Sequence, residues 1–200
     1  MEIFLCRHGE TDHNSSSIVQ GHMEVELNEK GSSQAVKLAD KLARLEPDYL
    51  YSSPLLRTMQ TSKEISDQTG LEIREESLLK EVDQGDFEGE TVQVMIEAMN
   101  NAESENHEWA PKNGESMEEA RERAARFLQK LKEKHQNQTV AAVAHGGFKS
   151  VMILEALGHN SKNFNKIAQD NCCINVIKLD SEHGTVVQKV NDTSHLEEKN

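Results

Sequence analysis

The sequence predicts an α/β domain whose central sheet is mostly parallel, and three observations support this. Apolar, β-prone runs alternate with amphipathic helical patterns along the chain, which is the order of elements in α/β layering. The 200 residues suit one domain with a sizeable core. Two of the apolar runs end in histidine-glycine, at the position where parallel sheets bind ligands. We expect the domain to span residues 1–190, followed by a polar tail at 191–200.

The individual elements follow from hydrophobic period and capping residues. The expected strands lie at 3–6, 49–52, 140–144, 174–179 and 186–190, with a further candidate at 73–75. Four helices are expected between them. The first is capped by Asn28; the second is capped by Ser53, has Pro54 at its first position and ends at Gly70; the third opens with the capping box of Ser116 and Glu119; the fourth follows Gly146-Gly147 and ends at Gly158.

Composition excludes several classes of partner and location. The formal net charge of -13 argues against nucleic acid and anionic membranes, because phosphate backbones attract basic surfaces. The chain lacks an apolar run long enough for a membrane span, and its N-terminus lacks the features of a signal peptide. The three cysteines are too few and too badly spaced for a disulfide framework. We therefore expect a cytoplasmic protein.

Two apolar runs lead directly into histidine and glycine. The run at 3–6 continues as Arg7-His8-Gly9, and the run at 140–144 continues as His145-Gly146-Gly147. At the carboxyl ends of parallel strands, glycine lets backbone N–H groups approach an anion, and a helix N-terminus adds positive potential. Each histidine alone also fits a buried residue that satisfies a turn. Together with Arg7, the two histidines indicate an anion site.

Arg57 is a second indication of an anion site. It falls in the first turn of the helix expected after Ser53, where a cation opposes the helix dipole and an acid would be more stabilising. Arginine beside a helix N-terminus binds anions strongly, so this exception to a local rule favours a function. A solvated surface arginine is the alternative.

The stretch Arg7-His8-Gly9-Glu10-Thr11 resembles the signature of the histidine phosphatase superfamily, the phosphoglycerate-mutase-like proteins. Further matches follow in the order of that family. They are Asn14, Gln20-Gly21, Leu27, Gly31, Gln34-Ala35, Ser52-Ser53-Pro54-Leu55, Arg57, Gln60-Thr61, Glu81, Gly85, Phe87-Glu88-Gly89, Gly114-Glu115-Ser116, Val143-Ala144-His145-Gly146-Gly147 and Asp170-Asn171. The resemblance implies a three-layer α/β/α sandwich and the hydrolysis of phosphomonoesters.

The resemblance also implies roles for four residues: His8 becomes transiently phosphorylated, while Arg7, Arg57 and His145 bind the phosphoryl oxygens. A neutral imidazole, with a reference pKa of about 6.5, is a competent nucleophile once a hydrogen bond fixes its tautomer. Phosphoryl transfer requires mainly positioning and electrostatic stabilisation, which arginine provides through its paired N–H groups. The expected chemistry therefore uses no metal ion and no cofactor.

Glu81 is expected, from the resemblance, to give a proton to the leaving oxygen. Repulsion by a nearby phosphate would favour its protonated form. Without the family, it would be an ordinary surface acid. Asn14, Gln20, Gly21 and Gly146 complete the expected substrate contacts, although amides in loops also often cap turns.

The sequence departs from the family pattern at four places, one of them Asn113, which replaces the first glycine of a Gly-Gly-Glu-Ser segment. Glu24-Val25-Glu26-Leu27 lacks the usual proline, and Phe87 stands where tryptophan is usual. Val82 follows Glu81 where the mutase branch has an arginine for its carboxylate-bearing substrate. This difference favours the phosphatase branch, with its alpha-ribazole phosphatases and broad-specificity phosphatases.

Three alternatives stay open. A cofactor-dependent phosphoglycerate mutase would retain the phosphate and need a bisphosphorylated primer. An inactive phospholigand-binding module would normally have lost His8, His145 or one of the arginines, and all are present. A metal protein would draw on the nine histidines, yet the chain has no HExxH motif or comparable ligand spacing.

The expected partner is a small-molecule phosphomonoester, and the loops at 12–28 and 85–116 are expected to select it. These loops carry no recognisable code, so sugar phosphates, phosphoglycerate derivatives, nucleotide-like phosphates and ribazole phosphate are all candidates. Dimers occur in the family, so a homodimer is one expectation for the assembly.

Overall fold

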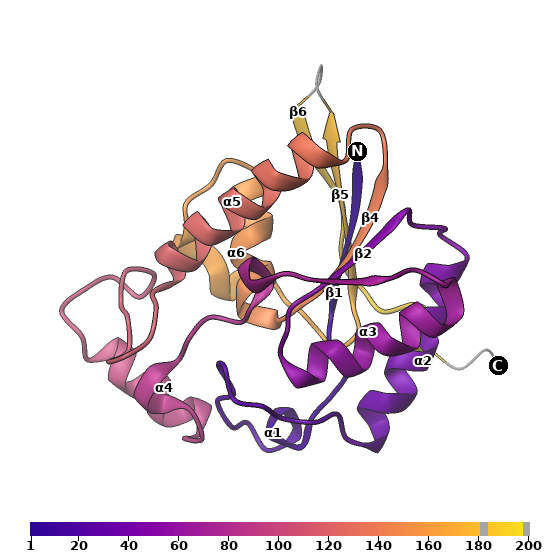
Figure 1. Ribbon diagram of the computed structural model, residues 1–200. Coiled ribbons are helices and arrows are strands. Elements are labelled where there is room, and N and C mark those ends of the chain that lie inside the picture. The colour runs from indigo at the N-terminus through magenta and orange to yellow at the C-terminus, as the bar shows by residue number, and fades with distance from the viewer. Residues whose placement is uncertain (181–183, 198–200) are drawn as a thin grey trace.

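A six-stranded sheet runs through the centre of the molecule, with helices on both faces (Figure 1). The computed structural model describes residues 1–180 and 184–197. The strands are β1 (Glu2–Arg7), β2 (Tyr49–Ser52), β3 (Ile73–Glu75), β4 (Thr139–Ala144), β5 (Ile174–Asp180) and β6 (Gly184–Asp192). The helices are α1 (Asp12–Ser15), α2 (Glu29–Ala43), α3 (Leu56–Thr69), α4 (Val92–Asn100), α5 (Met117–Lys134) and α6 (Gly146–Ala156). Three short 3-10 helices lie at Ser77–Leu79, Gly85–Phe87 and Ser161–Lys166.

The strand order is β3-β2-β4-β1-β5-β6, and the first four strands are parallel to one another. The last two strands are antiparallel to their neighbours. Helices α2 and α3 cover one face and α5 and α6 cover the other, while α1 and α4 lie beyond the edge where β1 ends (Figure 1). The mostly parallel sheet and the three-layer α/β/α arrangement are therefore confirmed.

The core has two parts, one on each side of the sheet, because strand side chains point alternately to opposite faces. In β1, Ile3 and Leu5 pack on the side of α5 and α6. Phe4 and Cys6 pack on the side of α2 and α3. A strand buried on both faces reads as a continuous apolar run, which is why the sequence located these central strands.

Two of the predicted helix starts are confirmed. The side chain of Asn28 accepts a hydrogen bond from the backbone N–H of Gly31 at the start of α2. Ser116 and Glu119 form the expected capping box at the start of α5. Gly70 ends α3 with a φ of 73°, a left-handed conformation that glycine adopts without a steric penalty.

The predicted cap of the second helix is wrong. Helix α3 begins at Leu56, and Leu55 is its N-cap without a side-chain hydrogen bond. The carboxylate of Glu24 instead accepts the N–H of Leu56, with a distance of 2.8 Å between Oε2 and N. The acidic loop that lacks the family's proline therefore supplies part of the missing cap. The hydroxyl of Ser53 has a different partner, the imidazole ring of His145.

Other differences concern the ends of elements and the segments between them. Helix α6 begins at Gly146, with His145 as its N-cap, rather than after Gly147. Helices α1 and α4 had no expected counterpart. Residues 191–200 were expected to form a polar tail. Strand β6 instead continues to Asp192, and Leu196 packs against the core beside α2. Residues 198–200 lie outside the described residues. Within 1–180 and 184–197, no helix combines the length and the hydropathy that crossing a lipid bilayer requires.

Candidate active site

The two histidines of the sequence pattern meet at one edge of the sheet. Strands β1 and β4 are parallel neighbours, and their last residues, Arg7 and Ala144, lie opposite each other. The backbone N–H of His8 donates to the carbonyl oxygen of Ala144, with 3.1 Å between the atoms. The imidazole rings of His8 and His145 consequently lie 5.2 Å apart between their centroids. The two histidines therefore lie side by side, as expected from the sequence.

His8 is buried and held in one tautomer. Its Nδ1 lies 2.7 Å from the carbonyl oxygen of Gly9, which can only accept a hydrogen bond, so Nδ1 carries the proton and Nε2 has a free lone pair. Burial holds the pKa of His8 well below its ordinary value, and the positive charges of Arg7 and Arg57 lower it further. The imidazole is therefore neutral at neutral pH.

Position 9 requires glycine because the backbone of α2 lies very close to it. A Cβ atom at Gly9 would lie 2.4 Å from the carbonyl oxygen of Gly31, which no side chain tolerates. The N–H of Gly9 donates to the hydroxyl of Thr61 on α3. The loop after β1 is therefore fixed against both α2 and α3.

The guanidinium groups of Arg7 and Arg57 are oriented by backbone carbonyls. Arg57 donates from Nη1 to Met23 and from Nη2 to Gly21, at 2.9 and 2.8 Å. Arg7 donates from Nη1 to the carbonyl of Gln169. Burial lowers the pKa of Arg57 to about 10, which leaves it positively charged at neutral pH. Both arginines therefore present fixed positive charges.

His145 is bound to Ser53, the serine that the sequence pattern had assigned to a helix cap. The ring Nε2 lies 2.8 Å from Ser53 Oγ. Burial and the charge of Arg57 hold the pKa of His145 well below its ordinary value. Because Leu55 N–H donates to the same hydroxyl oxygen, the hydroxyl proton is free to point at Nε2. That arrangement puts the ring proton on Nδ1.

Three buried nitrogens of this group have no hydrogen-bond partner within the described ranges: Nε of Arg7, Nε of Arg57 and Nδ1 of His145. Buried N–H donors are rarely left unpaired, because the loss of hydration costs about 1–3 kcal/mol each. Donors of this kind on two guanidinium groups and one imidazole suit the oxygens of a tetrahedral anion.

The carboxylate of Glu81 lies at the N-terminus of α6, next to this group. Its Oε1 accepts the N–H groups of Val82 and Phe148, each at 2.9 Å, and its Oε2 accepts the N–H of Gly147 at 3.2 Å. A Cβ atom at Gly147 would lie 3.0 Å from Oε1, so glycine gives the carboxylate its place. Its charge acts on both Arg7 and Arg57. Glu81 therefore belongs to the same site.

The backbone of Glu81 is also held from two sides. His22 donates from Nε2 to the carbonyl oxygen of Glu81 at 2.8 Å, and Arg123 donates to the same oxygen at 3.2 Å. His22 thus has a positioning contact, although the sequence gave no reason to single it out.

The remaining predicted residues lie in the segment between β1 and α2, except Gly146, which begins α6. The hydroxyl of Thr11 lies 3.1 Å from both Asn14 Oδ1 and Gln20 Oε1, and these two oxygens share its single proton. The amide oxygens are therefore used within the protein, and the amide nitrogens are the groups left to donate. The carbonyl oxygen of Gly21, a residue with a φ of 44°, accepts a hydrogen bond from Arg57. Gly146 lies against the guanidinium group of Arg7.

Sequence reasoning missed several contributors. Asn171 donates to the carbonyl of His8 and to Asn14, and Gln169 holds Arg7. Asn171 and Thr61 were part of the family pattern, which was a usable signal for them. Gln169 carries no such signal, because it acts through its backbone carbonyl.

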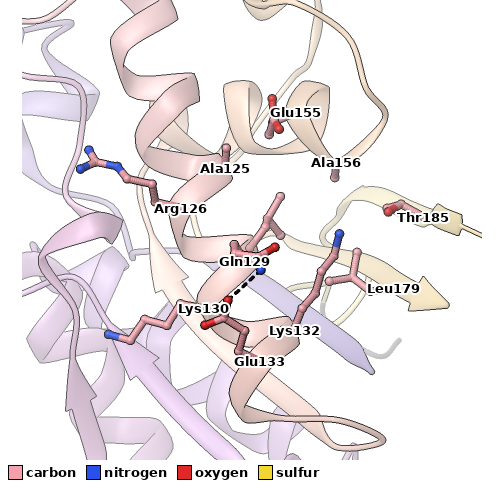
Figure 2. A pocket seen from close by; sticks show the side chains of 11 residues that line it. Ala125, Arg126, Gln129, Lys130, Lys132, Glu133, Glu155, Ala156, Leu179 and Thr185 are labelled. Carbon is pink, nitrogen blue, oxygen red and sulfur yellow. Dashed lines mark hydrogen bonds between the residues drawn. The ribbon is translucent and has the colours of Figure 1, made fainter. Parts of the chain in front are cut away.

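A surface pocket of about 540 Å³, whose side chains are drawn in Figure 2, is lined by neither His8 nor His145. It lies between α5, α6 and the β5–β6 pair, and its charged side chains are of both signs, with Gln129 bound to Glu133.

Among the described residues, no cluster of three or more histidine, cysteine, aspartate or glutamate side chains is arranged to hold a metal ion.

An α/β sheet that brings a neutral, tautomerically fixed imidazole to two guanidinium groups has the requirements of a phosphoryl-transfer enzyme. Arg7, Arg57 and His145 each have a buried donor left for an anion, and the carboxyl group of Glu81 lies at the start of the same helix as His145. The fold and the site together define this class.

The chain belongs to the histidine phosphatase superfamily (branch 1), whose model matches residues 3–193. Phosphoserine phosphatase 1 of Hydrogenobacter thermophilus is 33% identical over 202 residues, covering 99% of this chain and 95% of the relative. The metal-independent phosphoserine phosphatase of Arabidopsis thaliana is also 33% identical and covers 98% of this chain and 83% of its own. A mycobacterial glucosyl-3-phosphoglycerate phosphatase, solved with VO3, superposes with a TM-score of 0.86 at 27% identity, covering 96% and 99% of the two chains. The protein is a phosphoric monoester hydrolase.

Proposed function

We propose that the protein hydrolyses small-molecule phosphomonoesters by moving the phosphoryl group first to His8 and then to water. The observation that carries this proposal is a set of buried donors on Arg7, Arg57 and His145, which have no partner among residues 1–180 and 184–197 and lie beside an imidazole that is kept neutral. These donors suit the three equatorial oxygens, on which the transition state spreads its negative charge.

In the first step, the lone pair of His8 Nε2 attacks phosphorus and the bond to the ester oxygen breaks. The bond from His8 Nδ1 to Gly9 stabilises the positive charge that develops on the ring. Glu81 gives its proton to the departing oxygen, which leaves as an alcohol. Three backbone N–H groups hold the carboxyl group of Glu81 in place at the start of α6.

In the second step, water attacks the phosphorus of phosphohistidine, and the P–N bond breaks. Glu81, now ionised, takes a proton from the attacking water, so each turnover restores its protonated form. The products are an alcohol and inorganic phosphate.

The test is hydrolysis of p-nitrophenyl phosphate by the purified protein. We expect turnover that survives excess EDTA, an acid-labile phosphoprotein during turnover, and the loss of both in His8→Ala. His159→Ala is the matched control, since His159 is exposed, and it should retain full activity. Strong inhibition by EDTA, or equal activity in the two variants, would refute the proposal.

The role of Glu81 has its own test. We expect Glu81→Gln to slow the hydrolysis of alkyl phosphates far more than that of aryl phosphates, because only poor leaving groups need protonation. Equal losses on both classes of ester would remove Glu81 from the proton-transfer role.

Val82 bears on the choice between phosphatase and mutase. It is 1% exposed and belongs to the core beside α5 and α6, so it offers a substrate no charged contact at the place of the mutase arginine. With 3-phosphoglycerate and its bisphosphate primer, we therefore expect free phosphate and no 2-phosphoglycerate.

The substrate is best sought with a panel of phosphorylated metabolites. Phosphoserine and glucosyl-3-phosphoglycerate belong in it because the relatives are named for them. We further propose a cytoplasmic location, where the free thiols of Cys6, Cys172 and Cys173 would stay reduced. The expected homodimer is tested by light scattering.

A further inference from the structure

Lys149 on α6 is fully buried, with 0% of its surface exposed. Phe148 and Val151, which lie one and two residues away, are core residues, and Lys149 follows His145 by one helical turn. Removing an ammonium group from water costs several kcal/mol unless other groups compensate. A lysine at this place therefore needs an explanation that packing alone does not provide.

The ammonium group binds a cysteine that is itself connected to Arg7. Lys149 Nζ donates to Cys173 Sγ, with 3.1 Å between the atoms. The Sγ–H of Cys173 donates to the side-chain oxygen of Gln169, whose backbone carbonyl accepts from the Arg7 guanidinium. The backbone carbonyl of Cys173 also accepts the N–H of Arg7. Lys149 is thus linked, through one short segment, to both ends of Arg7.

Burial lowers the pKa of Lys149, Cys173 and Cys6 raise it, and Arg7 lowers it further; no carboxylate is among these strongest influences. The sulfur of Cys173 accepts from Lys149 and donates to Gln169, so it links the two side chains. An anion bound at Arg7 would favour the charged form of Lys149.

The same charge acts on His8. The pKa of His8 is lowered by burial, by Arg7 and Arg57 and, in addition, by Lys149, whereas the hydrogen bond to Gly9 raises it. His145 is the other titratable ring beside His8. Lys149 thus contributes to keeping the nucleophile neutral, although it does not touch the site of attack.

We propose that Lys149 is a positioning residue of the phosphoryl site: its buried ammonium group orders the segment from Gln169 to Cys173 that holds Arg7, and adds positive charge behind the bound phosphoryl group. This inference rests on the proposed function, because it takes Arg7 as a phosphoryl ligand. It also makes Cys173 a structural partner of the site.

The test uses Lys149→Met, which keeps the length of the side chain and removes the charge and the hydrogen bond. Lys162→Met is the matched control, because it makes the same change at an exposed lysine paired with Glu105. The probes are inorganic phosphate, whose Kd is measured by calorimetry, and p-nitrophenyl phosphate, whose kcat/KM is followed against pH.

For Lys149→Met we expect phosphate to bind about tenfold more weakly, as one charge acting through protein would produce. The acid limb of kcat/KM should move toward higher pH, because a charge that lowers the pKa of His8 is gone. Thermal stability should be unchanged or higher, since replacing a buried charge by an apolar group is often stabilising. Lys162→Met should show none of these changes.

An unchanged phosphate Kd and an unchanged acid limb in folded Lys149→Met would overturn the proposal. Should that variant not fold, Cys173→Ala, which breaks the link and keeps the charge, must weaken phosphate binding; wild-type affinity there would overturn the proposal equally. Phosphate binding needs no turnover, so this failure is distinct from a failure of the proposed function, which would appear as absent hydrolysis by the wild-type protein.

Discussion

Replacing Ser53 with alanine removes the hydroxyl that sets the tautomer of His145. In the wild-type protein this hydroxyl lies 2.8 Å from Nε2, and Nδ1 is a buried donor without a protein partner in the described part of the chain. Without the hydroxyl, the ring is free to carry its proton on Nε2. Nδ1 then becomes an acceptor, which repels a phosphoryl oxygen instead of binding it.

The magnitude follows from the burial of the pair. Leaving one buried polar group without its partner costs about 1–3 kcal/mol. Since about 1.4 kcal/mol corresponds to a factor of ten in rate, Ser53→Ala should lower kcat/KM about 10- to 100-fold. We expect most of the loss in kcat, because the charge on the phosphoryl oxygens is redistributed in the transition state.

The assay compares Ser53→Ala with Ser52→Ala on an aryl phosphate. Ser52 is equally buried, and its hydroxyl donates to the carbonyl of Ser53, away from both histidines, so its loss should have a similar effect on thermal stability with little effect on rate. Ser53→Thr, which keeps a hydroxyl, should recover part of the activity. Equal rates for Ser53→Ala and Ser52→Ala would refute the tautomer argument.

Three further results are expected. The free energy of unfolding should fall as the pH drops below about 6.5, because the pKa values of His8 and His145 are lowered in the folded protein and only the unfolded chain takes up the protons. Each histidine should contribute up to about 1.4 kcal/mol per pH unit. Urea denaturation at several pH values measures this slope, and His8→Gln should remove about half of it; an undiminished slope would contradict the burial argument. Arg57→Lys should lower kcat/KM about 100-fold or more and weaken inhibition by phosphate. Lysine cannot bind the carbonyls of Gly21 and Met23 together, and it has no Nε. Near-wild-type kinetics would exclude Arg57 as a phosphoryl ligand. Ser116→Ala should cost about 1 kcal/mol of stability, seen as a melting temperature lower by about 2–4 °C, because the capping box of α5 is lost; an unchanged melting temperature would show that the cap is not needed.

The central strands and their histidines were predictable from the sequence because local pattern and tertiary role coincide there. An apolar run buried on both faces, followed by histidine and glycine, identifies both the strand and the edge at which it ends. Helix α4 was not predictable in this way. None of its residues is fully buried, and Val94 and Ile96 are 44% and 37% exposed, so the pattern lacks the clear apolar face of a packed helix.

Ser53 shows where local reasoning fails. Serine before proline fits a helix cap, but its hydroxyl binds a ring 92 positions further along the chain, and nothing near Ser53 in the sequence indicates that partner. Lys149 is a similar case, because a lysine within an apolar helix is usually one whose end reaches the surface. Both residues became visible only from the three-dimensional contacts.

The antiparallel direction of β5 brings the last part of the site to the same edge as the first. Strand β5 starts where β1 ends, so the N–H of Cys172 bonds the carbonyl of His8 and the N–H of Arg7 bonds the carbonyl of Cys173. During synthesis, a chain stalled on the ribosome before Cys173 has emerged would have its nucleophile but not the segment that fixes it. Such distant contacts also slow folding, because long loops must close first. The onset of phosphatase activity should therefore come late in translation and mark the moment when nearly the whole chain has folded.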